Sequence, residues 1–191
     1  MTPAPWGLLV RPSATFAGLA RSEHARWGLQ AALITGASWA VFLLALHLGG
    51  HQPSGPLLLP IPRASYYAWE AAFAVPIYAG MFYVKSGVLH GLARRLGGSA
   101  AWRQTQQVAG GSILVSSVVG WLIPDVVVFV VAGFSALATA MPFYVPVSVL
   151  WGITLATLGA RAVHGLSRGR ALFAGTIAWM AHVMVGAPFL R

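Results

Sequence analysis

The chain has 191 residues, of which 58% are hydrophobic and 8% are charged. Ordinary globular proteins carry about 25% charged residues, so the composition excludes a soluble domain and indicates an integral membrane protein. The formal net charge of +9 would favour nucleic-acid binding in a soluble chain. Here the arginines lie beside apolar runs long enough to span a bilayer, so no nucleic-acid partner is expected. The absence of cysteine excludes disulfides and thiolate metal sites.

The first 28 residues are expected to lie at the membrane surface. Aromatic and aliphatic side chains alternate there with arginines, and the pair Pro12-Ser13 can start a helix. We therefore expect residues 1–28 to form a cytoplasmic, interfacial amphipathic segment, with a partly ordered tail as the alternative.

Residues 29–191 are expected to form a single transmembrane domain. A spanning helix needs about 20 mostly apolar residues, and four runs meet this requirement. A loop rich in glycine and proline separates the first run from the second, and a Gly-Gly pair follows the second. The four predicted spans are residues 29–48, 65–92, 143–160 and 171–190.

The stretch from 102 to 141 can hold one spanning helix or two short ones. Cytoplasmic loops carry an excess of Lys and Arg, and one crossing places three basic clusters on the same side. We therefore favour an all-α bundle of five spans, with the third at 102–123, the amino terminus cytoplasmic and the carboxyl terminus outside. Pro124-Asp125 is expected to break that helix and to leave a kinked extension to about 134, or a re-entrant half-helix. The clusters are Arg11, Arg21 and Arg26; Arg94, Arg95 and Arg103; and Arg161, Arg168 and Arg170.

Ionisable side chains within the spans are the first candidates for a functional site, because a charge in hydrocarbon costs about 2.5 kcal/mol or more. Glu70 and Lys85 are separated by about 22 Å of helix, so they cannot pair directly. Each is expected either to reach its nearer interface or to join a polar site inside the bundle. Asp125 at the helix break and His182, which is expected to hydrogen-bond within the bundle, complete these candidate intramembrane positions.

Basic residues beside the spans are candidate contacts for anionic lipid headgroups at the cytoplasmic face. A basic side chain near an anionic surface contributes about 1 kcal/mol. The candidates are Arg94, Arg95, Arg103, Arg161, Arg168 and Arg170.

Small residues recur every four positions in the predicted spans, as at helix faces that pack closely. We interpret them as packing faces within the bundle, with a homo-oligomer interface as the alternative. The runs include Gly36 with its neighbours at 32 and 40, Gly87 and Gly91, Ser112, Ser116 and Gly120, Gly152 with Ala156, and Ala178 with Gly186.

No catalytic constellation is evident. The chain has three acidic residues and lacks the motifs of serine hydrolases, zinc hydrolases and phosphate-binding loops. We therefore expect no catalytic, cofactor or metal site, and no enzymatic activity. One short echo remains, in which His90-Gly91-Leu92-Ala93-Arg94 is similar to His164-Gly165-Leu166-Ser167-Arg168. It indicates either two related halves or a chance match.

Four motifs carry a family resemblance: Pro12-x-x-x-Phe16, Tyr66-Tyr67, the segment from Ala93 to Gly98 followed by Trp102 and Thr105, and His164 to Arg168. Together they resemble the bacterial branch of the Yip family, the Ypt/Rab-interacting membrane proteins. The resemblance implies a compact five-span domain with a cytoplasmic amino terminus, here in a bacterial inner membrane. Eukaryotic members are implicated in vesicle trafficking and contact small GTPases. This chain lacks their Asp-Leu-Tyr-Gly-Pro motif and long amino-terminal region, so the resemblance does not extend to a GTPase partner.

These observations predict a non-enzymatic membrane protein of Yip type that binds lipids or partner proteins and organises the membrane. A second copy of the chain or another membrane protein is the expected protein partner. The alternative is a small transporter or permease component with polar sites at Glu70, Lys85 and the Pro124-Asp125 break.

Overall fold

The computed structural model describes residues 6–21 and 26–189, and all regular structure in these ranges is helical. Five helices are long and apolar enough to cross a membrane, which confirms the predicted all-α bundle of five spans. They are α3 (Trp27–Leu48), α4 (Arg63–Arg95), a composite helix over Trp102–Ala132, α7 (Phe134–His164) and α8 (Arg168–Gly186), which a 3₁₀ turn extends to Phe189. The composite helix consists of α5 (Trp102–Leu114), a π-helical segment (Val115–Leu122) and α6 (Ile123–Ala132).

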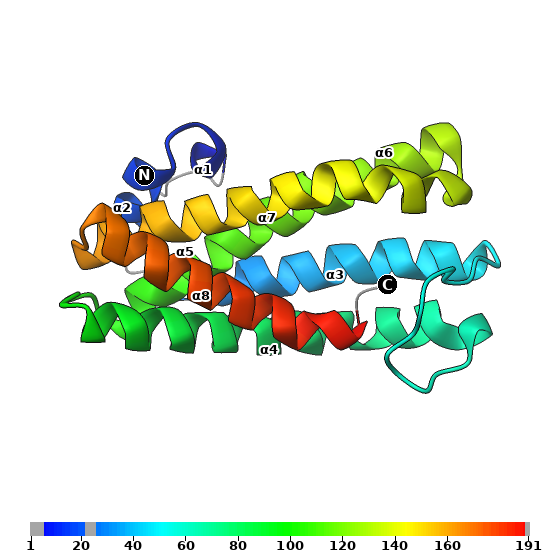
Figure 1. Cartoon of the computed structure of the whole chain (residues 1–191), viewed down its shortest axis with the longest axis horizontal. Coiled ribbons are helices and arrows are strands. Elements are labelled where there is room, and N and C mark those ends of the chain that lie inside the picture. The colour runs from blue at the N-terminus through cyan, green and yellow to red at the C-terminus, as the bar shows by residue number, and fades with distance from the viewer. Residues whose placement is uncertain (1–5, 22–25, 190–191) are drawn as a thin grey trace.

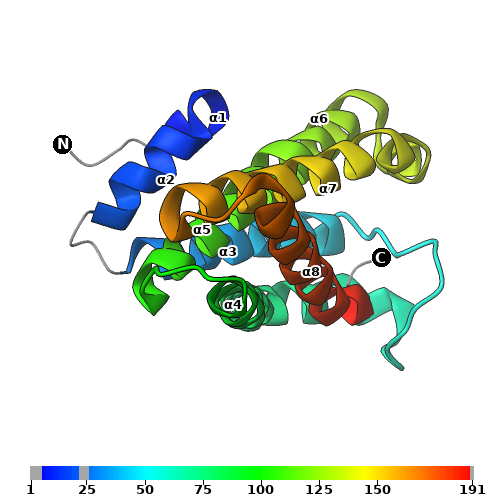
Figure 2. The same cartoon turned by 60° about the vertical axis from the view of Figure 1, so that its left-hand side comes forward.

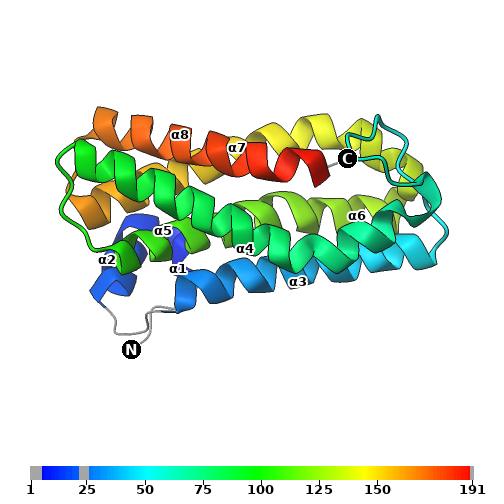
Figure 3. The same cartoon turned by 90° about the horizontal axis from the view of Figure 1, so that it is seen from below.

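The spanning helices run along one long axis, so the molecule has two distinct ends (Figure 1). At the arginine-rich end, α4 and α7 finish and α5 and α8 begin, and two short helices, α1 (Gly7–Val10) and α2 (Pro12–Arg21), lie beside them. At the loop end lie the loop of residues 49–62 and the turn between α6 and α7. Figure 3 shows that α8 finishes well before the loop end.

The third span is continuous where the sequence predicts a break, so that prediction is wrong. Proline lacks an N–H and clashes with the carbonyl four residues earlier, which for Pro124 is that of Gly120. The helix adopts the wider π form over Val115–Leu122 and returns to α form at Ile123, so the mismatch is absorbed before the proline. The chain then stays helical to Ala132, and Gly133, with φ of 81°, turns it into α7.

The fourth span is longer than predicted because its prolines lie inside the helix. It begins at Phe134 rather than at 143 and continues through Pro142 and Pro146 to His164. Prolines are tolerated in membrane helices where other groups satisfy the freed backbone carbonyls.

The helix α2 is docked onto the bundle by one face (Figure 2). Phe16 is fully buried, and a Cβ atom added at Gly111 or Gly159 would lie 2.9 or 3.1 Å from its ring. These two glycines of α5 and α7 therefore form the notch that receives Phe16. Ser13 and Arg21 of α2 are exposed. Residues 1–5 and 22–25 of the predicted interfacial segment lie outside the described residues.

The small-residue positions pack within the bundle at most of the helix crossings. A Cβ atom at Gly36 would lie 2.9 Å from the Cα of Val75, and one at Gly152 would overlap the ring of Trp179. The packing interpretation is wrong for Gly87 and Gly91, since no atom lies within 4 Å of a Cβ added at either position.

The tightest crossing joins the start of α3 to α5 and yields a testable prediction. A Cβ at Gly110 would overlap the carbonyl of Gly28, a backbone group that cannot move aside. We expect Gly110→Ala to destabilise the protein by about 1–3 kcal/mol or more, measured as thermal unfolding in detergent. The matched control is Gly87→Ala, which adds a methyl group in open space and should be neutral or slightly stabilising. Equal stability of the two variants would contradict the backbone contact.

Candidate functional site

Three separate groups of buried polar side chains lie along the bundle. One centres on Lys85 between α4 and α8, one on Asp125 between α6 and α7, and one on Thr105 at the arginine-rich end. The first and third groups join helices that are distant in the sequence, and the second joins the consecutive helices α6 and α7.

Lys85 is fully buried and does not reach the interface. Its Nζ atom lies 4.0 Å from the centroid of the Trp179 ring on α8, and no described residue accepts a hydrogen bond from it. A cation over a tryptophan face gains about 0.5–2 kcal/mol, which is less than the cost of burying an ammonium group. The structure therefore excludes the snorkelling interpretation for this residue and favours a polar position inside the bundle.

His182 lies beside the same tryptophan. The rings of His182 and Trp179 are 5.0 Å apart between centroids, and the imidazole is 3% exposed. Lys85 is close enough to act on His182 electrostatically, so two of the four candidate intramembrane positions meet. Trp179 completes the Lys85–Trp179–His182 cluster and packs against Gly152 of α7.

Glu70 is not part of this cluster. It is half-buried near the loop end and close enough to act electrostatically on the hydroxyl of Tyr78. It also lines a cavity of about 220 Å³ together with Tyr66 and Phe189, the last described residue. Glu70 and Lys85 therefore belong to different sites, as their separation of about 22 Å along the helix requires.

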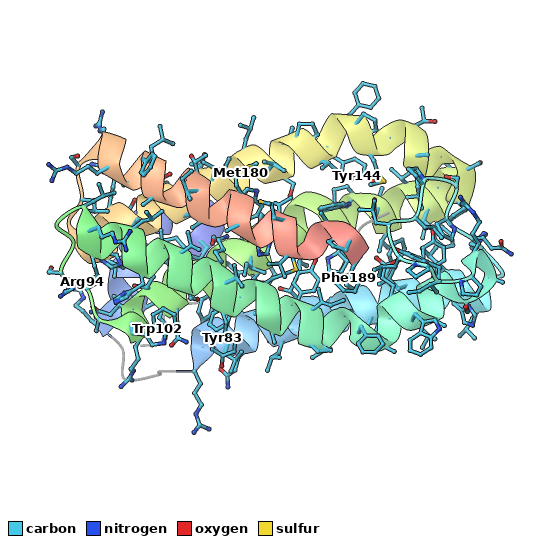
Figure 4. All side chains as sticks on the ribbon, turned by 60° about the horizontal axis from the view of Figure 1, so that its bottom comes forward. Tyr83, Arg94, Trp102, Tyr144, Met180 and Phe189 are labelled. Carbon is cyan, nitrogen blue, oxygen red and sulfur yellow. The ribbon has the colours of Figure 1, made fainter. Side chains whose placement is uncertain are left out.

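Asp125 is fully buried and accepts a hydrogen bond from the hydroxyl of Tyr144. This bond joins α6 to α7 about two to three turns from Gly133, and Tyr144 is labelled in Figure 4. A hydrogen bond to an ionised group is worth about 1.5–3 kcal/mol, and here it joins the two arms of the hairpin. Asp125 therefore has a structural role at the position where a helix break was expected.

The π-helical segment is attached to α7 by a buried serine. The hydroxyl of Ser148 donates to the carbonyl oxygen of Ser116 at 2.7 Å. A Cβ at Gly120, one turn further, would lie 3.0 Å from the Ser148 side chain, so α7 approaches the segment closely there. The irregular backbone is thus enclosed by protein, as irregular backbone in a membrane must be.

The third group joins the ends of three helices through one hydroxyl. Thr105 Oγ1 lies 2.9 Å from His90 Nδ1 and 2.9 Å from His164 Nε2. A hydroxyl donates one proton, so at least one imidazole must present its N–H to Thr105, and the tautomers of the two histidines are coupled. Gly98 fits against this group because a Cβ there would lie 2.8 Å from His164 Nδ1. The two similar motifs thus meet in space, because the histidine of each contacts Thr105.

The six candidate lipid-contacting arginines all lie at the arginine-rich end (Figure 4, where Arg94 is labelled). Five are exposed, and Arg161 is half-buried. Arg170 donates from Nη1 to the carbonyl of Leu96 at 3.1 Å, which joins the start of α8 to the loop after α4. Arg161 lines a cavity of about 250 Å³ with Ser13 of α2 and Gly165 at the end of α7. The candidates therefore share one end of the molecule but not one contact site.

Several residues of these groups could not be chosen from the sequence. Trp179 and Tyr144 look like ordinary apolar residues of a span until a partner from another helix is known. Ser148 has no signal beyond its small size. Thr105 and Phe16 were named only as parts of short motifs, and the structure gives each a specific contact. Among the described residues no three His, Asp or Glu side chains are grouped closely enough to hold a metal ion.

Comparison with known proteins matches residues 6–190 to the Yip1 domain. No curated protein and no solved structure is matched by the chain. The match covers all five spanning helices together with α1 and α2. The chain is therefore an integral membrane protein that belongs to the Yip family.

Proposed function

We propose that this protein is a non-enzymatic membrane organiser that binds anionic lipid headgroups at its arginine-rich end. The observation that carries the proposal is the cavity of about 250 Å³ between α2 and α7, lined by Ser13, Arg161 and Gly165. The Nε atom of Arg161 is shielded from solvent, and no described residue accepts a hydrogen bond from it. A phosphate oxygen is the kind of acceptor that such a guanidinium group takes.

The surrounding charges support the same ligand class. Arg11 and Arg21 are exposed at this end in addition to the five exposed candidate arginines, whereas the three acidic residues of the chain lie elsewhere or, for Glu23, outside the described residues. Anionic headgroups would therefore be attracted to the whole end and held in the cavity. The exposed Ser13 hydroxyl can donate a second hydrogen bond at the cavity rim.

The predicted lipid preference can be measured with purified protein in nanodiscs. We expect bound phosphatidylglycerol to exceed phosphatidylcholine in native mass spectrometry. Arg161→Gln should weaken retention of phosphatidylglycerol about tenfold, since a charge-assisted hydrogen bond is worth about 1.5–3 kcal/mol. The matched control Arg168→Gln removes an exposed charge and should have a smaller effect that disappears at high salt. Equal effects of both variants would refute a specific headgroup site.

The arginine-rich end is proposed to face the cytoplasm, because short cytoplasmic loops carry the Lys and Arg excess. This orientation places both α2 and the headgroup cavity at the inner leaflet. Reporter domains fused after Arg103 and after Arg170 are then expected to lie inside, and those fused after His51 and Met141 outside. The opposite pattern would move the proposed headgroup site to the other leaflet. Residence in a bacterial inner membrane remains a prediction of the resemblance.

A small transporter is the second candidate, favoured by the buried Lys85–Trp179–His182 cluster. A lysine with no hydrogen-bond acceptor costs stability, which is a reason for such a residue to have a function. Against transport, the side chains that line the cavity of about 730 Å³ at the loop end include no Asp, Glu, His, Lys or Arg.

Lys85→Met separates the two candidates. It replaces the amine by an apolar side chain of similar length. We therefore expect the free energy of unfolding to rise by about 1–3 kcal/mol, and the thermal midpoint to rise with it. A lipid organiser should retain its phosphatidylglycerol binding in this variant. A transporter should lose flux in proteoliposomes, as it should with Glu70→Gln or Asp125→Asn. Flux at the level of empty vesicles for native protein and variants alike would remove the transport hypothesis.

A further inference from the structure

A large cavity lies at the loop end, opposite the proposed headgroup site. It has a volume of about 730 Å³, within the usual range of ligand sites. Its walls are formed by α7, by Tyr67 of α4 and by Ser54 and Gly55 of the loop. The helix α8 ends at Gly186, well before this end of the molecule (Figure 3), and contributes no residue to the cavity wall.

This cavity is open on its side toward the hydrocarbon. Ala138, Pro142 and Pro146 follow one another at four-residue intervals on α7, and all three line the cavity and are exposed. The lining extends along α7 from Phe134 to Pro146, about 18 Å of helix. One leaflet of the hydrocarbon core is about 15 Å thick. The groove therefore has the length of one acyl chain lying in its own leaflet.

The groove wall also carries polar groups. A proline cannot donate to the carbonyl four residues earlier, so Pro142 and Pro146 free the carbonyls of Ala138 and of Pro142 itself in the groove wall. The hydroxyls of Ser54 and Ser135 lie nearer the loop end. Such groups suit the glycerol and ester region of a phospholipid.

The one Arg or Lys that the structure describes at the loop end lies at the mouth of the groove. Arg63 is one helical turn before Tyr67 on α4, and its Nη1 donates to the carbonyl of Pro53, directly before the lining residues Ser54 and Gly55. The guanidinium has five N–H donors and is exposed, so donors remain for a phosphate. Cation and apolar groove are thus arranged as headgroup and tail are in a phospholipid.

We infer that this groove holds one acyl chain of a phospholipid from the loop-end leaflet, with its phosphate on Arg63. The occupant is a membrane phospholipid and neither a peptide nor a second copy of the chain, because the groove combines the length of a leaflet with a single cation at its water-facing mouth. The inference does not depend on the headgroup site at the other end of the molecule.

The test uses the full chain in nanodiscs with a phospholipid that carries a photoreactive diazirine in one acyl chain. We expect crosslinks to concentrate on residues 134–146 of α7. Ala138→Trp fills the groove and should reduce this labelling at least about fivefold. Thr139→Trp adds the same ring at an adjacent exposed position outside the lining and should leave the labelling unchanged.

A second part of the experiment tests the phosphate contact. Arg63→Gln should raise the phospholipid concentration needed for half-maximal labelling about tenfold, as loss of a charge-assisted bond predicts, and Arg63→Lys should restore most of it. Diacylglycerol, which lacks the phosphate, should compete poorly. Since Arg63 is exposed, this arm does not depend on the folding of the tryptophan variant. Labelling spread evenly to Val147 and Leu150, unchanged labelling in Ala138→Trp, or equal competition by diacylglycerol would each overturn the inference.

Discussion

The backbone contact between α3 and α5 at Gly28 and Gly110 is the constraint on which the rest of the bundle depends. In a membrane the lipid tails are as apolar as the side chains, so helices associate through close packing and not through the hydrophobic effect. Glycine at both sides of the crossing brings the axes close, and Gly111 then faces Phe16 of α2. The same stretch of α5 carries Thr105, which meets His90 and His164. One crossing therefore fixes α3, α2 and the ends of α4 and α7 around α5.

The buried polar contacts have different roles at different depths in the membrane. Near the loop end Asp125 and Tyr144 join α6 to α7, and in the middle Ser148 encloses the π-helical backbone. These two contacts satisfy polar groups that the irregular third span would otherwise leave exposed to hydrocarbon. The Lys85 cluster differs, since its amine is covered by an aromatic ring and not satisfied by an acceptor. Among the buried groups described above, it has the least evident contribution to stability, and it is therefore the first place to look for a function.

The number of spans could be predicted because it depends on counts of apolar residues and on the sign of the charges between them, both of which are local. The extent of the third and fourth spans could not, since proline is a helix breaker in general and is tolerated here only because the π-helical segment and neighbouring helices compensate. Glu70, Lys85, Asp125 and His182 were recognised as unusual from residue type alone. Trp179, which contacts Lys85, and Tyr144, which contacts Asp125, come from other helices, and no spacing within the sequence links these pairs. The echo motifs at His90 and His164 were visible, but their meeting point at Thr105 required the fold.

The early end of α8 makes the molecule unequal in the two leaflets. At the arginine-rich end five spanning helices are joined by α1 and α2, whereas past Gly186 and the short 3₁₀ turn four helices remain. The lipids that surround the protein therefore border different sets of helices in the two leaflets.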